Sequence, residues 1–175
     1  MTVIVAGQET AHGSSGTVDA LAFREAMSRF GAAVHVAATD GPAGRFGATV
    51  SAVASVSDAP PTLLVCLSRR GRMNAAVKAN GVFSINTLPA QGEALAHAFA
   101  GHGDLPMDVR FGLAGWSALA TGAPVLNNAR VAIDCRVTEF SEVGSHSVIF
   151  GTVAALRLGA RGPALIYLDR TYRHL

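Results

Sequence analysis

The connections between the first strand-like segments of this chain are too short to hold the crossover helices of a parallel sheet. An apolar segment at 33–39 is followed by the turn residues Asp40-Gly41-Pro42-Ala43-Gly44 and then by a second strand-like segment at 45–50. Turn residues of this kind between two strands are typical of a β-hairpin. Because parallel neighbours need a connection of roughly a dozen residues or more, the sequence predicts antiparallel pairing.

Strand-like segments also outnumber helix-like ones over the rest of the chain. Further strands are expected at 62–68, 82–87, 116–120, 131–140, 147–158 and 164–168. Helices are expected from Thr17, which can act as an N-cap, to Gly31, and at 73–80 and 91–100, where Gly81 and Gly101 follow. Residues 102–114 have turn residues but little apolar pattern.

This order of segments predicts a mainly β (α+β) fold. An antiparallel barrel with a few peripheral helices fits it better than a doubly wound sheet. Residues 1–16 are rich in Gly, Ser and Thr without hydrophobic periodicity, so we expect a flexible N-terminal tail followed by one domain at 17–175. Half of the 175 residues are hydrophobic, which predicts a sizeable core.

The net charge of +2 does not favour a function in nucleic-acid binding. No segment approaches the ~20 apolar residues that a membrane-spanning helix needs, and the first residues do not resemble a secretory signal. We therefore expect a cytoplasmic protein that binds neither nucleic acid nor membrane. Lys78 is the only lysine, and the one basic cluster is Arg69-Arg70-Gly71-Arg72. This cluster is either a solvated turn or a contact for the phosphate of a small ligand.

Common motifs for nucleotide, metal and hydrolytic sites are absent from the sequence. Neither Gly-x-Gly-x-x-Gly, Gly-x-x-x-x-Gly-Lys-[Ser/Thr] nor Gly-x-Ser-x-Gly occurs. His97 and His102 lie on either side of an expected helix end with Asp104 nearby, and we do not expect them to converge on a metal ion. Cys66 and Cys135 lie in separate apolar segments, which indicates small buried side chains rather than a disulfide.

The segment from Gly47 to Pro61 is unusual for a barrel strand. It has hydroxyl side chains at 49, 51, 55 and 57 and ends in a double proline. A neutral wall of hydroxyls and backbone amides suits a planar heterocycle with a polyol chain. A strand whose hydroxyls face water explains the same residues equally well, so the residues alone leave both interpretations open.

The same segment resembles the signature of the short-chain flavin reductases, the reductase partners of two-component flavin monooxygenases. Their pattern G-x-T-x-S-[SA]-x-x-S-[VL]-S-x-x-P-P matches Gly47 to Pro61, with Ala52 where many relatives have a second serine. The resemblance extends from Phe23 to Leu175. Further matching segments are 63–68, 83–88, 99–101, Arg110-Phe111 with Trp116, 122–126 and 167–173.

The resemblance implies a split β-barrel, a Greek-key antiparallel flavin-binding fold, that works as a homodimer. It implies that the isoalloxazine ring and ribityl chain of FMN or FAD lie against Ala48, Thr49, Val50, Ser51, Ala52, Cys66, Leu67 and Ser68. It places Arg72 and Asn74, with Phe99, Ala100 and Gly101, at the phosphate end. A guanidinium group such as that of Arg72 suits a phosphate.

The resemblance also implies a nicotinamide site at Gly144-Ser145-His146. In relatives the histidine packs against the nicotinamide of NADH or NADPH, so His146 is the predicted catalytic residue; Ser145 replaces a more familiar Asp. Tyr172 and Arg173 match an aromatic-basic ending that closes over the same pocket. No metal is implied.

The implied activity is NAD(P)H-dependent reduction of FMN or FAD, with NADH preferred. Hydride transfer between these cofactors needs orientation of the two rings and no protein nucleophile. Backbone amides, with Arg173, are expected to stabilise reduced flavin, which then passes to a partner flavin-dependent monooxygenase. Two alternatives stay open: a split-barrel flavoprotein that keeps its flavin and reduces another acceptor, and a non-catalytic flavin-binding module.

Overall fold

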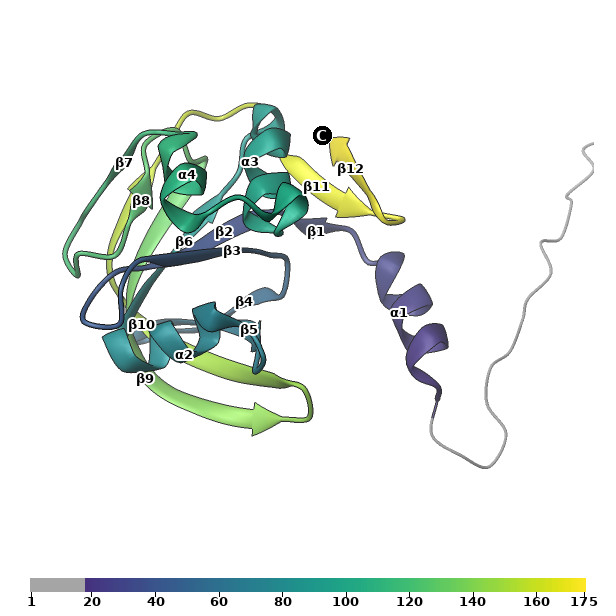
Figure 1. Cartoon of the computed structure of the whole chain (residues 1–175), viewed down its shortest axis with the longest axis horizontal. Helices are drawn as coiled ribbons and strands as arrows, with labels where there is room; N and C mark the ends of the chain where they lie inside the picture. The colour runs from purple at the N-terminus through teal and green to yellow at the C-terminus, as the bar shows by residue number, and fades with distance from the viewer. Residues whose placement is uncertain (1–17) are drawn as a thin grey trace, which may run out of the picture.

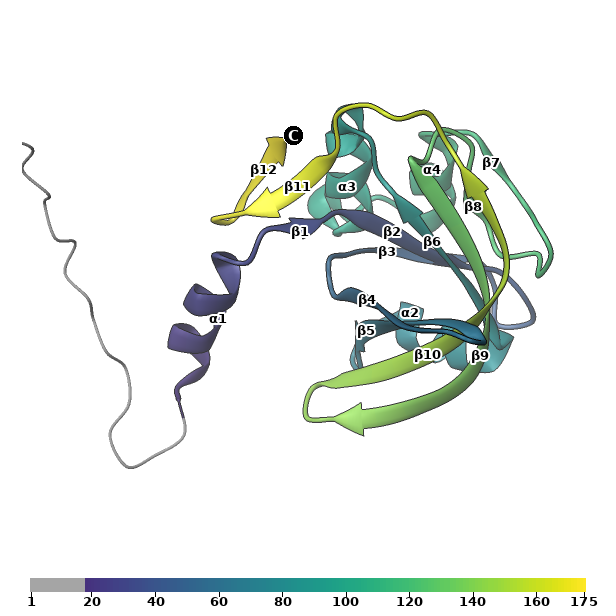
Figure 2. The ribbon, with the colours of Figure 1, turned by 180° about the vertical axis from the view of Figure 1, so that it is seen from behind.

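The computed structural model describes residues 18–175, and a seven-stranded antiparallel sheet dominates it (Figures 1 and 2). The predicted tail at 1–16 and the predicted cap Thr17 lie outside the described residues. The strand order is β3-β2-β6-β9-β10-β5-β4. The bounds are β2 His35–Thr39, β3 Phe46–Val50, β4 Val53–Asp58, β5 Pro61–Ser68, β6 Val82–Thr87, β9 Val131–Val143 and β10 His146–Leu158. This mainly β, antiparallel architecture confirms the predicted fold class.

Two smaller sheets complete the strand structure. β1 (Ala32–Ala33), β11 (Leu165–Leu168) and β12 (Thr171–His174) form a three-stranded sheet beside the barrel, and β7 (Trp116–Ser117) pairs with β8 (Val125–Leu126). The expected strand at 33–39 is broken at Val34, whose N–H donates to the carbonyl of Leu165 and whose carbonyl accepts from Leu88. Val34 therefore joins the small sheet to the barrel.

The two edges of the large sheet are consecutive in the chain. β3 is one edge strand and β4 is the other, and only Ser51 and Ala52 connect them. So short a connection forces the sheet to curl until its edges meet. β3 and β4 do not pair with each other. The N–H of Cys66 on β5 donates to the carbonyl of Ala52 and so extends the β4–β5 ladder into the connection. The backbone of this connection closes the barrel, and a seam between β3 and β5 stays open.

Within residues 18–175, four α-helices flank the strands (Figure 1). They are α1 Ala20–Ser28, α2 Arg72–Asn80, α3 Glu93–Phe99 and α4 Met107–Gly112, with short 3₁₀ turns at 90–92 and 102–104. Asp19 caps α1 by accepting from the N–H groups of Leu21 and Ala22. α2 ends at Gly81 in the left-handed conformation, as its position predicted. Figures 1 and 2 show α1 standing away from the barrel.

The core divides into two clusters that share β2. Ala37 faces Phe83, Ile85, Cys135 and the apolar side of α2, whereas its neighbours Val36 and Ala38 face α3 and α4. Because successive strand residues point to opposite faces, β2 is apolar on both sides. Cys135 is fully buried, which confirms the small buried role predicted for it.

Gly47 shows how the second core cluster positions β3. A Cβ atom at this position would lie 2.5 Å and 2.8 Å from two ring carbons of Phe99. Phe99 is 3% exposed and packs edge-on against Phe111 and Trp116, so its ring has no room to move away. Glycine at 47 therefore lets α3 lie against the strand that carries residues 48–50.

We expect Gly47→Ala to lower the free energy of unfolding by about 1–3 kcal/mol, the usual cost of overpacking a filled core. Gly112→Ala is the matched control, because a Cβ there meets no atom within 4 Å, and it should change stability by less than about 1 kcal/mol. Urea unfolding of both variants measures the difference. Equal stabilities would contradict the proposed contact with Phe99.

Candidate functional site

A cavity of about 310 Å³ lies in the seam between β3 and β5; we call it the seam cavity. Its walls come from β3 and the junction to β4, from the end of β5, from the start of α2 and from the start of β10. The lining residues are Ala48, Thr49, Val50, Ser51, Ala52, Cys66, Leu67, Ser68, Gly71, Met73, Asn74 and His146. The open edge of the barrel thus brings together segments that are far apart in sequence.

The wall of the seam cavity is neutral, since its lining contains no Asp, Glu, Lys or Arg. The hydroxyl groups of Thr49 and Ser51, on the β3 side of this wall, have different roles. Thr49 Oγ1 donates to the carbonyl of Ala96 at 2.6 Å and so ties β3 to α3. Ser51 is exposed, and its hydroxyl makes no hydrogen bond within residues 18–175. A free hydroxyl and the backbone groups of an edge strand fit a planar, neutral ring.

At the far end of the seam cavity, Asn74 and Cys66 are held by the protein itself. Asn74 is 3% exposed, and its Nδ2 donates to the carbonyl of Leu67 at 3.0 Å and to Ser147 Oγ at 2.8 Å. Its amide nitrogen therefore fixes β5 against β10. Cys66 is half-buried, and burial raises the pKa of its thiol, which keeps it protonated at neutral pH.

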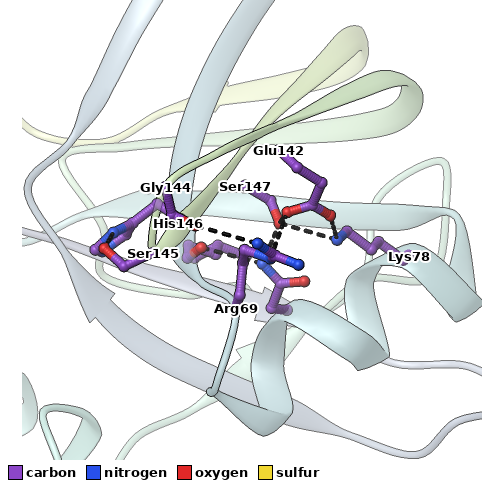
Figure 3. A network of polar contacts seen from close by, with 9 residues as sticks. Arg69, Lys78, Glu142, Gly144, Ser145, His146 and Ser147 are labelled. Carbon is purple, nitrogen blue, oxygen red and sulfur yellow. Dashed lines mark hydrogen bonds and ion pairs between the residues drawn. The ribbon is translucent and has the colours of Figure 1, made fainter.

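His146 closes the seam cavity from the β9–β10 hairpin. It is the first residue of β10, directly opposite Ser68 on β5 and Val143 on β9. Ser145 Oγ lies 2.9 Å from His146 Nδ1, so the serine that replaces the more familiar Asp still hydrogen-bonds the ring. Figure 3 shows Ser145 and His146 together at the turn of the hairpin, with Arg69 beside the turn.

A second cavity of about 570 Å³ adjoins the first on the other side of Thr49, Val50 and Ser51; we call it the C-terminal cavity. It is covered by α3 and by the β11–β12 hairpin. The other lining residues are Val34, Glu93, His97, Ala100, His102, Tyr167, Arg170, Thr171 and Tyr172. Burial raises the pKa of the Tyr172 hydroxyl, so this group remains a hydrogen-bond donor at neutral pH.

His97 and His102 contact each other at the edge of the C-terminal cavity, a contact that their spacing across a helix end did not suggest. Their Nδ1 atoms are 3.0 Å apart, because the chain reverses at Gly101, where φ is +94°. Glu93 lies 3.5 Å from His97 Nε2 on the far side of that ring. Within residues 18–175 no group of three or more His, Cys, Asp or Glu side chains is arranged to hold a metal ion.

Most predicted site residues lie around these two cavities, and four do not line either of them. The Arg72 guanidinium lies 4.9 Å from the ring centroid of Phe46, and Phe99 belongs to the core. Gly101 forms the turn after α3, and Arg173 is exposed on the face of β12 opposite Tyr172. Tyr172 and His146 line different cavities, although the sequence suggested a shared one.

Ser55 and Ser57, later in the predicted flavin segment, do not line the seam cavity as Thr49 and Ser51 do. β4 is exposed from Ala54 to Asp58, and Ser57 Oγ accepts from the N–H of Ala59. For Ser55 and Ser57 the water-facing interpretation is therefore the correct one. The segment 48–52 lines the seam cavity, and 53–58 does not.

Sequence reasoning missed the residues that the C-terminal hairpin and α3 add to the second cavity. Glu93, His97 and Arg170 face it from elements whose proximity depends on the small β1-β11-β12 sheet. It also missed Gly71, inside the basic cluster, and Met73, directly after it, which complete the seam cavity. The turn residues at 69–72 could have indicated that Gly71 and Met73 lie near the ligand.

Comparison with known proteins identifies the family. The model of the flavin reductase-like domain matches residues 27–175. The chain belongs to this family. It is 49% identical over 162 residues to a protein of Methylorubrum populi named FMN reductase (NADH) RutF, covering 93% of this chain and 79% of that one. The family predicted from the Gly47–Pro61 signature is confirmed.

Solved structures of flavin reductases share the fold. BorF, the flavin reductase component of a bacterial two-component tryptophan halogenase, is 28% identical with a TM-score of 0.83, covering 90% of this chain and 98% of that one. The Streptomyces globisporus NADH:FAD oxidoreductase SgcE6, solved with NAD and FAD fragments, is 26% identical with a TM-score of 0.82, covering 90% and 93%. None of the helices within residues 18–175 combines the length and apolarity of a membrane span.

The hydroxyls of Thr49 and Ser51 predict different effects of two small substitutions. Ser51→Ala should weaken FMN binding about fivefold, because it removes a hydroxyl that is free to bond a ligand. Thr49→Val should lower the melting temperature instead, since the Thr49 hydroxyl donates a hydrogen bond to the carbonyl of Ala96. Fluorescence titration with FMN and thermal unfolding separate the two effects. A stronger loss of FMN affinity in Thr49→Val would reverse these roles.

Proposed function

We propose that this chain catalyses the NADH-dependent reduction of FMN and supplies the reduced flavin to a separate flavin-dependent monooxygenase. The observation that carries the proposal is the seam cavity, whose neutral wall at 48–52 faces Ser68 and His146 across the open edge of the barrel. Membership of the flavin reductase-like family supports a flavin in this place. The name of the Methylorubrum relative supports FMN and NADH in particular.

In this proposal the two cavities receive different parts of the flavin. The seam cavity has no charged wall and takes the ring system, against the edge of β3. The C-terminal cavity has Arg170, His97 and His102 in its lining and takes the phosphate end, next to Ala100. Cationic and N–H donor groups suit a phosphate, whereas a neutral hydroxyl-bearing wall suits the ring.

The protein's part in the reaction is orientation. When bound, flavin and nicotinamide supply the hydride chemistry themselves. β3 and the end of β5 would hold the flavin ring, and His146, held by its hydrogen bond to Ser145, would limit where a nicotinamide can lie. Backbone N–H groups of the seam would be available to stabilise negative charge on the reduced ring. Arg173, exposed on β12, is not placed for that role.

The homodimer predicted from the sequence belongs to the proposal as well. α1 buries none of its residues: Leu21 and Phe23 on the helix are 72% and 58% exposed, and Phe30, just after it, is 66% exposed. A nine-residue helix is marginal in water without a packing partner, and a second copy of the chain would cover this apolar face. The cytoplasmic location expected from the sequence remains a prediction.

The activity is tested by mixing the purified protein with reduced nicotinamide and free flavin. We expect loss of nicotinamide absorbance with NADH and FMN, and slower loss when NADPH replaces NADH. Parallel rates with FMN, FAD and riboflavin show which flavin the cavities favour. Absence of NADH and NADPH oxidation with all three flavins would reject the proposal, and flavin retained through gel filtration while another acceptor is reduced would favour a flavoprotein of different activity.

The role of His146 is tested by His146→Ala. This variant should raise the KM for NADH about tenfold and leave the KM for FMN within about twofold, because the ring limits the position of the nicotinamide rather than that of the flavin. Steady-state kinetics with each substrate varied in turn measures both constants. Equal increases in the two constants would show that His146 belongs to the flavin wall.

A further inference from the structure

A cluster of charged and hydroxyl side chains lies on the face of the β9–β10 hairpin opposite the seam cavity (Figure 3). Glu142 and Ser147 are cross-strand partners just before and just after the turn. Because successive strand residues point to opposite faces, Ser147 faces α2 while His146 faces the cavity. Lys78 on α2 and Arg69, the residue directly after β5, both form ion pairs in this cluster.

Arg69 holds the turn of the hairpin at three points. Its Nε forms an ion pair with Glu142 Oε2 at 2.9 Å, and its Nη1 donates to the carbonyl of Gly144 at 3.2 Å. Its backbone N–H donates to the carbonyl of Ser145 at 3.0 Å. The turn that precedes His146 is therefore fixed to the end of β5, the strand that carries Ser68 and Cys66.

Ser147 has only one arrangement of hydrogen bonds available to it. Its hydroxyl is fully buried and accepts from Asn74 Nδ2 at 2.8 Å and from Lys78 Nζ at 2.9 Å. Both of these groups can only donate. The single hydroxyl proton therefore goes to Glu142 Oε2 at 2.9 Å, which must accept it. The network therefore requires a hydrogen-bond acceptor at position 142, and the Glu142 carboxylate supplies it.

Glu142 is the acceptor on which these groups converge. Lys78 Nζ lies 2.5 Å from its Oε1, and this hydrogen bond, followed by that from Ser147, lowers the pKa of the Glu142 carboxyl below its ordinary value. The group is therefore ionised at neutral pH. Lys78 is fixed further by the ring of Phe140, 4.5 Å from its Nζ. Charge-assisted hydrogen bonds of this kind resist displacement better than neutral ones.

We propose that Glu142 is a positioning residue for nicotinamide binding: together with Arg69 and Lys78 it holds the β9–β10 turn so that His146 keeps a fixed place at the rim of the seam cavity. The inference rests on the proposed function for the role of His146. Glu142 acts through the turn and not by contact with a ligand, since it lies on the opposite face of the hairpin. Small displacements of an orienting group, of about 1 Å, can reduce a rate by up to ~100-fold.

The first experiment compares Glu142→Gln with Glu139→Gln. Both remove a carboxylate from β9, but Glu139 has no ion-pair partner within residues 18–175. Glu142→Gln should raise the KM for NADH about tenfold and leave the KM for FMN within about twofold, whereas Glu139→Gln should change neither. Arg69→Gln should give the same split as Glu142→Gln. An unchanged KM for NADH, or an equal rise in both constants, would overturn the proposal.

A double-mutant cycle tests whether Glu142 acts through His146. If it does, Glu142→Gln should have little further effect on the KM for NADH once His146 is alanine, because the two substitutions remove the same function. Additive effects of the two substitutions would show that Glu142 acts independently of His146, and would overturn the positioning role.

Amide hydrogen exchange gives a readout that does not depend on activity. In the full-length protein, Glu142→Gln should accelerate exchange at residues 143–147 at least tenfold and leave β6 protected. Unchanged exchange at the turn would overturn the inference. Loss of protection throughout the sheet would overturn it too, since Glu142 would then support the whole fold. Absence of NADH oxidation by the unmodified protein would reject the proposed function alone, because the exchange result would still stand.

Discussion

The passage of the chain through Ser51 and Ala52 is the constraint on which the rest of the site depends. These two residues connect opposite edges of a seven-stranded sheet, so the sheet curls into a barrel whose closure is a backbone crossing instead of a strand pair. β3 keeps one side of its backbone free of a strand partner. An edge strand that exposes N–H and C=O groups is normally a liability, and here it forms the wall of a cavity.

The two sides of the seam cavity are built by different interactions. The β3 side is held by sheet pairing with β2 and by the packing of Phe99 on Gly47, which requires no charged group near the ligand. The opposite side depends on the turn of the β9–β10 hairpin, and the ion pairs of Glu142 with Arg69 and Lys78 support that turn. A neutral wall with few strong contacts also agrees with a flavin that is released after reduction.

The sequence predicted helices and strands well where a local signal, such as a terminal glycine or an apolar run, determined them. Gly81 ends α2 and the apolar run 82–87 forms β6 because each signal is local. β4 was not predicted, since Ser55 and Ser57 make it polar and it lies exposed at the sheet edge. α4 was not predicted either, because Phe111 is its only buried residue and no periodicity results.

The site residues, too, were predicted well only where the signal was local. The signature at 47–52 identified the seam wall because its residues are contiguous. Arg72 matched a phosphate position by spacing, yet its guanidinium packs on Phe46, since spacing does not determine the direction of a side chain. His97 and His102 were judged by helical spacing, and the left-handed turn at Gly101 brings them together. Such reversals depend on backbone angles that glycine permits without specifying.

The hairpin network is the clearest case of a function that no local pattern indicates. Towards the tip of the hairpin, β10 keeps partners on both sides, since His146 pairs with Val143 on β9 and with the last residue of β5. β9 loses its other neighbour, because its pairing with β6 ends at Arg136. Three segments meet at the tip of the hairpin. Arg69 comes from the end of β5, Lys78, the chain's only lysine, from α2, and Glu142 from β9. The ion pairs therefore support the end of β9, which has a strand partner only on its β10 side there.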